Sequence, residues 1–386
     1  MSAAPLIYLI AGEPSGDLLG GRLMAALKAE TGDAVRFAGV GGERMAEEGL
    51  RSLIPMHELA VMGFIEVLPH ARRILARIKE TVADIAAHRP DIVVTIDSSG
   101  FTWRVARRLR AAGSRVTLIH MVAPMVWAWR PHRAREIARW YDRLLALLPF
   151  EPPYFEKVGL ACTFVGHPVI ESGADRGDGP GFRARHHIAP ERPVLTVLPG
   201  SRRGEVERLL PIFGAAVALL APSHPTLRIV IPTLGHVAGL VRTLTANWPI
   251  APIIVAGEVE KFAAFAASDL ALAASGTVAL ELAVARLPAV IAYRIHPLTH
   301  AVARHMIKIR YANLVNLLLD RFAIPELIQY DCNAARIADA LTRLIGDKAA
   351  RTAQLAAYDV ALDLLGRGGE PPSRRAAKQI LAARSS

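Results

Sequence analysis

The sequence predicts an α/β protein made of two doubly wound domains with a cleft between them. Short runs rich in Val, Ile and Leu alternate with longer amphipathic stretches along almost the whole chain, a pattern typical of parallel strands covered by helices on both faces. The length of 386 residues exceeds one ordinary core, and a segment rich in Gly, Pro and charge interrupts the alternation near the middle. We therefore expect a first domain at 1–170, a linker at 171–190, a second domain at 191–348, and a helical tail at 349–386 that could pack back on the first domain.

The strands are expected where the apolar runs are continuous. In the first half these runs are Leu6–Ala11, Val35–Val40, Ile92–Ile96, Val116–Met121, Leu144–Leu148 and Thr163–Val165. In the second half they are Val194–Leu198, Ile229–Pro232, Ile253–Val255, Leu270–Ala273 and Ala289–Tyr293. Helical patterns such as Leu18–Glu30 and Ile74–His88 lie between them.

The bulk composition limits the class of protein. With 52% hydrophobic and 21% charged residues the chain is globular. Its two distant cysteines, Cys162 and Cys332, exclude a disulfide framework and a thiolate zinc site, and fit a reducing cytoplasm. We expect no signal peptide and no membrane span. The net charge of +11 favours nucleic acid, an anionic membrane or phosphorylated substrates as partners, and composition does not choose among these.

Two loops of the second domain are candidate phosphate sites, because each joins a strand to a helix N-terminus with free N–H groups. In residues 198–211, Gly200 and Ser201 turn the chain and Arg202 offers a guanidinium fork. The alternative is an ordinary turn with exposed arginines. In residues 267–288, Ser275, Gly276 and Thr277 precede a helix that carries Glu281. Glu281 could accept two ribose hydroxyls, or Ser275 could be a simple N-cap and Glu281 a dipole-compensating acid. Together the two loops suggest a nucleotide diphosphate.

The loop after the first strand, residues 11–23, is glycine-rich without being a GxGxxG or Walker A loop. This argues against an ATPase and, less strongly, against a dinucleotide enzyme. We assign sugar binding to its residues facing the cleft, which are Gly12, Glu13, Ser15, Gly16 and Asp17.

Asp97 comes directly after the buried strand Ile92–Ile96. A carboxylate at the carboxyl end of a strand is well placed as a general base, although it could instead cap the following turn. Farther on, Trp127 and Trp129 alternate, so that one is expected to pack and the other to meet a ligand if the segment is extended.

Several common motifs are absent. The chain contains no DxD, HExxH or GxSxG, so a metal–diphosphate bridge, a zinc protease and a common serine hydrolase have no support. We expect no metal and no cofactor.

The chain resembles the lipid-A-disaccharide synthase family in nine segments that occur in the family's order. These segments are AGEPSGDLLG, VMGFIEVL, VAPMVWAWRPHR, LLPFEPPYF, FVGHP, LPGSRRGEV, ASGTVALELA, AYR and YANLVNLL. The resemblance covers nearly the whole chain, from Leu6 to about Leu344, and the series of segments is far more specific than any single motif.

The resemblance implies a GT-B fold with the nucleotide held mainly by the second domain. It also implies an inverting reaction in which UDP-2,3-diacylglucosamine and 2,3-diacylglucosamine 1-phosphate give the β-1,6 disaccharide 1-phosphate and UDP. The implied location is the cytoplasmic face of the inner membrane, bound peripherally to its anionic surface, with a homodimer as one option. Nucleic acid is not an expected partner.

The resemblance also assigns roles to residues. Asp97 matches the proposed base, Arg202 the essential arginine, and Ser275, Gly276, Thr277 and Glu281 the nucleotide loop. Asn316 matches the NLL segment. The chain departs from the family after Asp97, where Ser98, Ser99 and Gly100 replace a small residue, a proline and an acid. It departs again where YANLVN replaces YVSLPN.

Two segments could meet the membrane. One is Met62–Ile78, where Phe64, Ile65, Leu68 and Ile74 lie beside Arg72, Arg73 and Arg77; the other is Leu298–Leu319. Either could be a plain core helix.

Three other functions remain open from the residues alone. A UDP-sugar 2-epimerase and a glycosyltransferase with another acceptor would keep the fold. A nucleic-acid-binding protein would use the arginines between Arg104 and Arg143, although the chain lacks a known binding motif for it.

Overall fold

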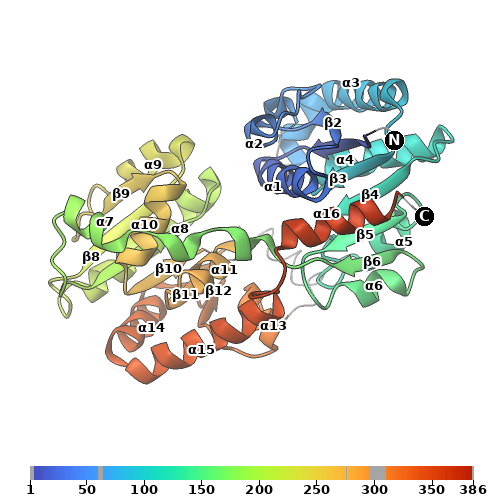
Figure 1. Cartoon of the computed structure of the whole chain (residues 1–386). Helices are drawn as coiled ribbons and strands as arrows, with labels where there is room; N and C mark the ends of the chain where they lie inside the picture. The colour runs from blue at the N-terminus through green and yellow to red at the C-terminus, as the bar shows by residue number, and fades with distance from the viewer. Residues whose placement is uncertain (1–3, 60–63, 275, 296–309, 385–386) are drawn as a thin grey trace. The chain divides into compact units, whose positions relative to one another are not determined.

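The computed structural model describes residues 4–59, 64–274, 276–295 and 310–384. The chain forms two compact units (Figure 1). The first holds Met1–Pro168 and Gly368–Ser386, and the second holds Val169–Arg367.

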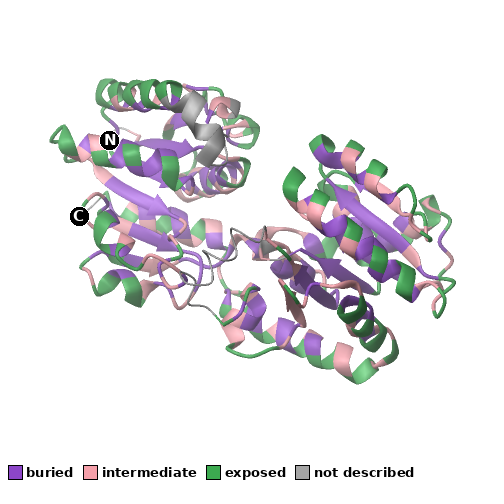
Figure 2. Cartoon of the chain, turned by 180° about the vertical axis from the view of Figure 1, so that it is seen from behind, coloured by how far each residue is buried: buried purple, intermediate pink, exposed green. Residues whose placement is uncertain are grey.

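The first unit is a parallel six-stranded sheet in the order β2-β1-β3-β4-β5-β6. Its strands are β1 (Leu6–Ala11), β2 (Arg36–Val40), β3 (Ile92–Ile96), β4 (Thr117–Met121), β5 (Arg143–Ala146) and β6 (Ala161–Phe164). Its helices are α1 (Pro14–Thr31), α2 (Glu43–Glu47), η1 (Met56–Glu58), α3 (Phe64–His88), α4 (Ser99–Ala111), α5 (Arg133–Ile137), α6 (Pro152–Glu156) and α16 (Pro372–Ala382). Ile78 of α3 and Phe101 of α4 pack on one face of the sheet, and Leu23 of α1 and Ile380 of α16 on the other. The central strands are therefore buried along their whole length (Figure 2).

The second unit is a parallel six-stranded sheet in the order β12-β11-β10-β7-β8-β9. Its strands are β7 (Val194–Leu198), β8 (Arg228–Thr233), β9 (Ile253–Ala256), β10 (Leu270–Ala273), β11 (Ala289–Tyr293) and β12 (Glu326–Ile328). Its helices include η2 (Pro168–Glu171), η3 (Ala174–Arg176), α7 (Gly179–Arg185), α8 (Arg203–Leu220), α9 (Gly235–Thr245), α10 (Glu258–Ala267), α11 (Thr277–Val284), α13 (Leu314–Leu319), α14 (Ala334–Gly346) and α15 (Lys348–Leu364). The predicted class, α/β with two doubly wound sheets, is confirmed.

The strand order creates a topological switch point in each sheet. In the first unit β1 lies between β2 and β3, and in the second β7 lies between β8 and β10. The chain leaves β1 toward β2 and leaves β3 toward β4, so the loops at the carboxyl ends of these neighbouring strands diverge. In the second unit the loops after β7 and β10 diverge in the same way. Open α/β sheets bind their ligands in the crevice formed at this point.

All eleven predicted strands are present, with ends that differ by two residues at most. The sequence prediction missed β12, a three-residue edge strand with no fully buried residue. Its three residues are too few to show an apolar run or an alternation.

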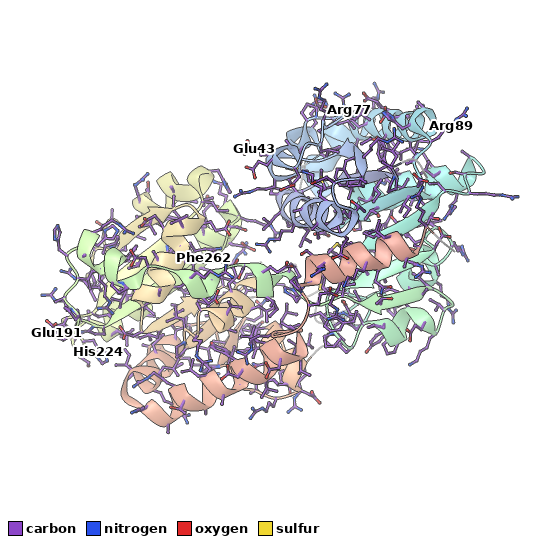
Figure 3. The ribbon with its side chains drawn as sticks, in the orientation of Figure 1. Glu43, Arg77, Arg89, Glu191, His224 and Phe262 are labelled. Carbon is purple, nitrogen blue, oxygen red and sulfur yellow. The ribbon has the colours of Figure 1, made fainter. Side chains whose placement is uncertain are left out.

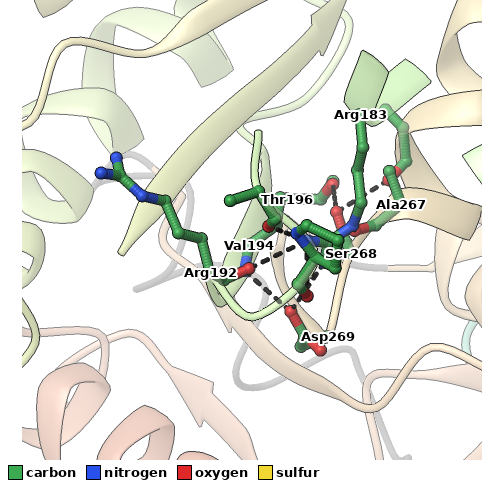
Figure 4. A network of polar contacts seen from close by, with 10 residues as sticks. Arg183, Arg192, Val194, Thr196, Ala267, Ser268 and Asp269 are labelled. Atoms are coloured by element: carbon green, nitrogen blue, oxygen red, sulfur yellow. Dashed lines mark hydrogen bonds and ion pairs between the residues drawn. The ribbon is translucent and has the colours of Figure 1, made fainter. Parts of the chain in front are cut away.

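The segment 171–190 differs from the expected linker, because it folds onto the second unit as η3 and α7. The guanidinium of Arg183 donates to Ala267 O at 2.9 Å and pairs with Asp269, which in turn accepts from Val194 N at 2.8 Å (Figure 4). Gly177 belongs to this packing, since a Cβ there would clash with the carbonyl of Phe262. The glycines that suggested flexibility thus permit close contact of two backbones.

The predicted tail divides between the two units. In α15, Tyr358 donates to Leu287 O at 3.1 Å, which fixes this helix to the second unit. In α16, which lies beside α1 (Figure 1), Arg375 donates to Phe164 O at 2.7 Å. The end of the tail therefore belongs to the first unit, and its beginning does not.

Candidate sugar and nucleotide sites

The predicted sugar loop and Asp97 meet at the switch point of the first sheet. Ser15 Oγ, in the first turn of α1, lies 3.5 Å from Asp97 Oδ2. Gly12 allows this approach, because a Cβ there would lie 2.5 Å from Ser98 Oγ. The structure thus brings Gly12, Ser15 and Asp97 together at the carboxyl ends of β1 and β3.

Asp97 has a backbone conformation that sets it apart from a simple turn residue. Asp97 and Ser98 both adopt left-handed φ values, 49° and 48°, and consecutive left-handed residues are unusual outside glycine. The Asp97 amide donates to Met121 O at 3.0 Å, and Thr102 Oγ1 donates to Asp97 O at 2.8 Å, so the strain is held by β4 and α4. Ser98, not Asp97, occupies the N-cap of α4. Asp97 therefore does not occupy the N-cap of α4, and its half-buried carboxylate stays a candidate base.

Glu13 and Gly16 position α1 against the sheet. Glu13 is the N-cap residue of α1, and its carbonyl accepts from Asp17 N at 3.0 Å. Gly16 is buried, and a Cβ there would lie 3.3 Å from Ile96 O. The small residue lets the first turn of α1 lie directly against the end of β3.

The predicted sugar-binding role of Asp17 does not fit the structure, because the residue is only 4% exposed and its carboxylate faces the protein. It accepts hydrogen bonds from Gly42 N at 2.7 Å, Arg44 N at 2.9 Å and Met45 N at 3.1 Å. These donors open α2, so Asp17 caps that helix from a distance and also offsets its dipole. It has no oxygen directed to a sugar.

We expect Asp17→Ala to lower the free energy of unfolding of the first unit by about 1–3 kcal/mol, because the change leaves buried backbone donors without an acceptor. Urea unfolding monitored by tryptophan fluorescence measures this loss of unfolding free energy. Four of the five tryptophans (Trp103, Trp127, Trp129 and Trp140) belong to this unit. Glu156→Ala, at an exposed position of α6 in the same unit, is the control. An unchanged urea midpoint together with a raised KM would restore the sugar-binding assignment.

A buried polar network ties β3, β4 and α4 together beside Asp97. Trp103 Nε1 donates to His120 Nε2 at 3.3 Å, so Nε2 carries no proton and His120 Nδ1 must donate to Thr95 Oγ1 at 2.7 Å. Thr95 Oγ1 then donates to Tyr141 Oη at 3.0 Å. Burial lowers the pKa of His120 to about 3, which keeps the ring neutral at physiological pH. The network fixes α4 and the loop that precedes it.

The first phosphate loop of the second unit follows β7 at the switch point, and its N–H groups are partly occupied. Ser201 N and Arg202 N both donate to Glu205 Oε2 at 3.2 Å, and Tyr293 Oη donates to Glu205 Oε1 at 3.0 Å. Gly200, with φ 104°, leaves room for this carboxylate. The sequence analysis did not single out Glu205, because it follows the motif as one acid among many charged residues.

Arg202 is the N-cap residue of α8, and its side chain is 65% exposed. Its Nη1 lies 3.4 Å from Glu205 Oε1. The N–H groups of Arg203 and Gly204 open the helix and have no acceptor in a preceding turn. This end of α8 thus combines a guanidinium with a helix dipole, as an anion site requires.

The second phosphate loop follows β10 and lies next to the first, because Ala274 N donates to Leu198 O at 2.8 Å. Gly276, with φ 60°, is the N-cap residue of α11. Ser275 and the side chain of Thr277 lie outside the described residues. Glu281 is half-buried, and both of its carboxylate oxygens accept from Lys261 Nζ at 3.0 Å. Lys261, on α10, was not predicted as a site residue, because no recognisable motif surrounds it in the sequence.

The predicted substrate-binding role of Asn316 does not fit the structure either, because its side chain is fully buried and all of its hydrogen-bonding groups are used within the fold. Its Oδ1 accepts from Ala323 N and Ile324 N at 2.8 Å each, and its Nδ2 donates to Ile324 O and Glu326 Oε1. These bonds fix the turn into β12. An amide carries two donors and two acceptor lone pairs, and here all four are engaged.

The two candidate ligand tryptophans lie in a turn segment, so the extended conformation on which their predicted alternation depends is absent there. Trp127 Nε1 donates to Glu151 Oε1 at 3.2 Å, and Trp129 lies under the guanidinium groups of Arg130 and Arg133. Burial raises the pKa of Glu151 to about 7.

No helix within the described ranges is both long and apolar enough to cross a bilayer. No group of three or more His, Cys, Asp and Glu side chains in that part of the chain could hold a metal ion.

The fold is shared with solved nucleotide-sugar enzymes. A UDP co-structure of MnaA from S. aureus aligns over 98% of this chain and 95% of its own, with a TM-score of 0.67 and 14% identity. The calicheamicin glycosyltransferase CalG4 aligns over 99% and 98%, with a TM-score of 0.60 and 18% identity. The two sheets and the helix-terminal loops at their switch points therefore define a GT-B fold, a class of glycosyltransferases and related epimerases.

Sequence comparison then gives the family. The family model described as lipid-A-disaccharide synthetase matches residues 7–380. The lipid-A-disaccharide synthase of Rhodospirillum centenum is 58% identical over 97% of this chain and 94% of its own length, and that of Paramagnetospirillum magneticum 54% identical over 97% of both. The chain belongs to the lipid-A-disaccharide synthase family and is a glycosyltransferase of lipid A biosynthesis.

Proposed function

We propose that the chain transfers 2,3-diacylglucosamine from UDP-2,3-diacylglucosamine to 2,3-diacylglucosamine 1-phosphate. The products are the β-1,6 disaccharide 1-phosphate and UDP. The observation that carries this proposal is the family match over residues 7–380. The polar groups at the two switch points support it, because this chemistry needs a base and an anion site.

In the proposed mechanism, Asp97 takes the proton from the acceptor's 6-hydroxyl as that oxygen attacks the anomeric carbon of the donor. The new C–O bond forms while the bond to the diphosphate breaks on the opposite face, so the configuration inverts and UDP leaves with the electron pair. No covalent link to the enzyme is needed.

The second unit would hold the nucleotide through both of its phosphate loops. Arg202 and the N-terminus of α8 stabilise the charge that develops on the leaving diphosphate. Glu281 accepts the ribose hydroxyls while Lys261 holds its carboxylate in place. Glu205 keeps the first loop in the conformation that presents Arg202.

Product analysis tests this proposal. The enzyme is incubated with both substrates, and with each substrate alone. We expect UDP release only when both are present, in equal amount with a disaccharide monophosphate seen by mass spectrometry. A 2-epimer of the donor formed without acceptor would instead support the epimerase alternative.

We also propose peripheral attachment to an anionic membrane through α3, which places the enzyme near its lipid substrates. Arg72, Arg73 and Leu75 are exposed on this helix. Two of the residues expected to meet the membrane have other roles. Ile74 is buried in the core, and Arg77, labelled in Figure 3, pairs with Glu58 and Glu80. The side chains of residues 64–71 lie outside the described set, as do residues 60–63 and 296–309.

We expect binding to anionic vesicles that weakens as salt rises, because exposed arginines act through screened attraction. Arg72→Gln with Arg73→Gln should weaken vesicle binding in a sedimentation assay and leave UDP affinity unchanged. The control removes the same charge through Arg51→Gln and Arg89→Gln, at exposed positions away from the middle of α3. Equal losses in both double variants would mean that net charge, rather than this helix, governs attachment.

A further inference from the structure

Glu151 is a buried carboxylate that the proposed mechanism does not use. It is 3% exposed and lies in the turn between β5 and α6, at the carboxyl edge of the first sheet. Although it is the N-cap residue of α6, its side chain makes no cap bond to that helix, which is described throughout. Its oxygens face two other segments, the turn that precedes it and the β4 loop, which we define as residues 122–132 between β4 and α5.

Three N–H donors converge on this carboxylate. Its Oε2 accepts from Leu147 N at 3.2 Å and from Leu148 N at 3.0 Å, and its Oε1 accepts from Trp127 Nε1 at 3.2 Å. All three partners can only donate, so the arrangement suits the ionised form. A protonated carboxyl would place an O–H among N–H groups that cannot accept it, which weakens the bond to the oxygen that carries the proton.

Burial opposes the ionised form that these donors favour. It raises the pKa of Glu151 to about 7, and the three N–H bonds offset this only in part. No charge of a described residue contributes to the shift. On the β6 side lies Cys162, whose own pKa is raised to about 12 by burial and by the charges of Glu151 and Glu156, so the thiol stays neutral. Glu151 therefore changes its charge near neutral pH, and its thiol neighbour does not.

The β4 loop begins directly beside Asp97. The amide of Asp97 donates to Met121 O at 3.0 Å, at the end of β4, and the loop starts at the next residue. That residue, Val122, has a left-handed φ of 82° although its side chain is β-branched, a conformation that is rare and strained. Strain of this kind persists only where the surroundings hold it, and it is typical of functional sites.

The β5 side holds the β4 loop in this conformation at two points. Val122 N donates to Leu145 O at 3.1 Å, at the start of the loop. Farther along, the indole of Trp127 donates to Glu151 and meets the ring of Phe150 edge-on, with centroids 5.2 Å apart. The backbone bond and the ring contact do not depend on pH, whereas the bond to Glu151 does, because it needs an ionised acceptor.

We propose that Glu151 is a positioning residue, whose ionised carboxylate holds the β4 loop in place beside Asp97 and whose protonated form releases it. This role rests on the proposed function, in which Asp97 meets the acceptor. When the carboxyl gains a proton, the bond from Trp127 weakens and the loop loses its polar anchor on the β5 side. Use of the acceptor should then decline, while the nucleotide, which we assign to the second unit, should bind as before.

Stability and activity should respond to pH in opposite directions. Because folding raises the pKa of Glu151, the stabilising contribution of its proton is complete below about pH 4.5 and is lost as pH rises through about 7. The urea midpoint of the wild type relative to that of Glu151→Gln should therefore fall over this range. Acceptor kinetics should improve over the same range, which a residue with only a structural role would not produce.

The first measurement follows the resting wild-type chain and needs no substrate. The full chain is labelled with fluorotryptophan, and the fluorine resonance of Trp127 is assigned as the one missing from Trp127→Phe. We expect this resonance to shift with a midpoint near pH 7. In Glu151→Gln it should stay constant from about pH 6 to 8, because the amide has no proton to gain in this range. A wild-type resonance that does not move between these limits would overturn the proposal.

The second measurement is the pH profile of kcat/KM for the monophosphate acceptor. The wild type should lose activity on the acid side with a midpoint near pH 7. Glu151→Gln should be about 10-fold less active at alkaline pH, the scale of one buried hydrogen bond, and should lack this acid limb. Glu156→Gln, the same change at an exposed position of α6, should keep the wild-type profile. UDP affinity should be unchanged in both variants.

Trp127→Phe separates the indole bond from the two backbone bonds. It keeps the ring contact with Phe150 and removes the N–H, so Glu151→Gln should cost less in this background than in the wild type. Equal losses in both backgrounds, or a wild-type acid limb in Glu151→Gln, would mean that Glu151 serves the fold alone. A resonance that titrates in a chain that forms no disaccharide would uphold the loop contact and remove the proposed function. Disaccharide formation with a constant resonance would remove the role of Glu151 alone.

Discussion

Asp97→Asn is expected to lower turnover by about 100- to 10,000-fold, the contribution of a well-placed general base. Asparagine is nearly isosteric with aspartate and tolerates the left-handed backbone seen at this position. It cannot accept the proton of the acceptor hydroxyl. The loss should therefore appear in kcat at saturating substrates, with UDP affinity and the urea midpoint close to those of the wild type.

The control for this variant is Asp33→Asn. Asp33 also has a left-handed φ, 63°, but lies exposed after α1, away from the carboxyl edge of the sheet. The same chemical change there should leave turnover intact. If Asp97→Asn retains most of its activity, the base is another acid of this unit. Glu13, the N-cap residue of α1, is one candidate, and Asp17 is excluded by its three backbone bonds. Glu66, whose side chain lies outside the described set, is also a candidate.

Arg202→Ala is expected to lower turnover by about 100- to 1,000-fold, because it removes one charge-stabilising donor from the leaving diphosphate. Arg202→Lys should recover part of this, since an ammonium group keeps the charge and loses the planar fork. Steady-state kinetics with saturating donor measures both.

The neighbouring Arg203 provides a matched control. It is the first residue of α8, its side chain is 76% exposed, and it pairs with Glu207 at 2.8 Å. Arg203→Ala removes the same charge one position away and should cost little. Equal losses in the two alanine variants would mean that the basic surface of this helix end, and not Arg202 itself, acts on the diphosphate.

The sequence predicted the strands well because each central strand is buried on both faces. Runs such as Ile92–Ile96 then read as unbroken apolar stretches, which periodicity detects. It also predicted that the glycine-rich loop after β1 and Asp97 follow the carboxyl ends of strands, since these ends and the glycines after them are visible in the chain. Ser15 and Asp97, which stand 82 positions apart, meet where this argument places them.

The sequence prediction was wrong for polar side chains that form hydrogen bonds within the fold instead of facing a ligand. Asp17 lies in α1 and Asn316 in α13, and their oxygens accept from backbone donors of other segments, Gly42 and Ile324 among them. Nothing in the local pattern distinguishes a carboxylate that caps a neighbouring helix from one that meets a sugar. The same holds for Lys261, whose role depends on the packing of α10 beside Glu281.

The central claim is a direct displacement with one base, Asp97, and no covalent enzyme intermediate. The most direct test is the configuration of the new glycosidic bond, read from the anomeric proton coupling in the NMR spectrum of the purified product. Starting from the α-linked UDP donor, we predict a β linkage formed in one inversion. An α linkage would require retention, and so would contradict the role given to Asp97.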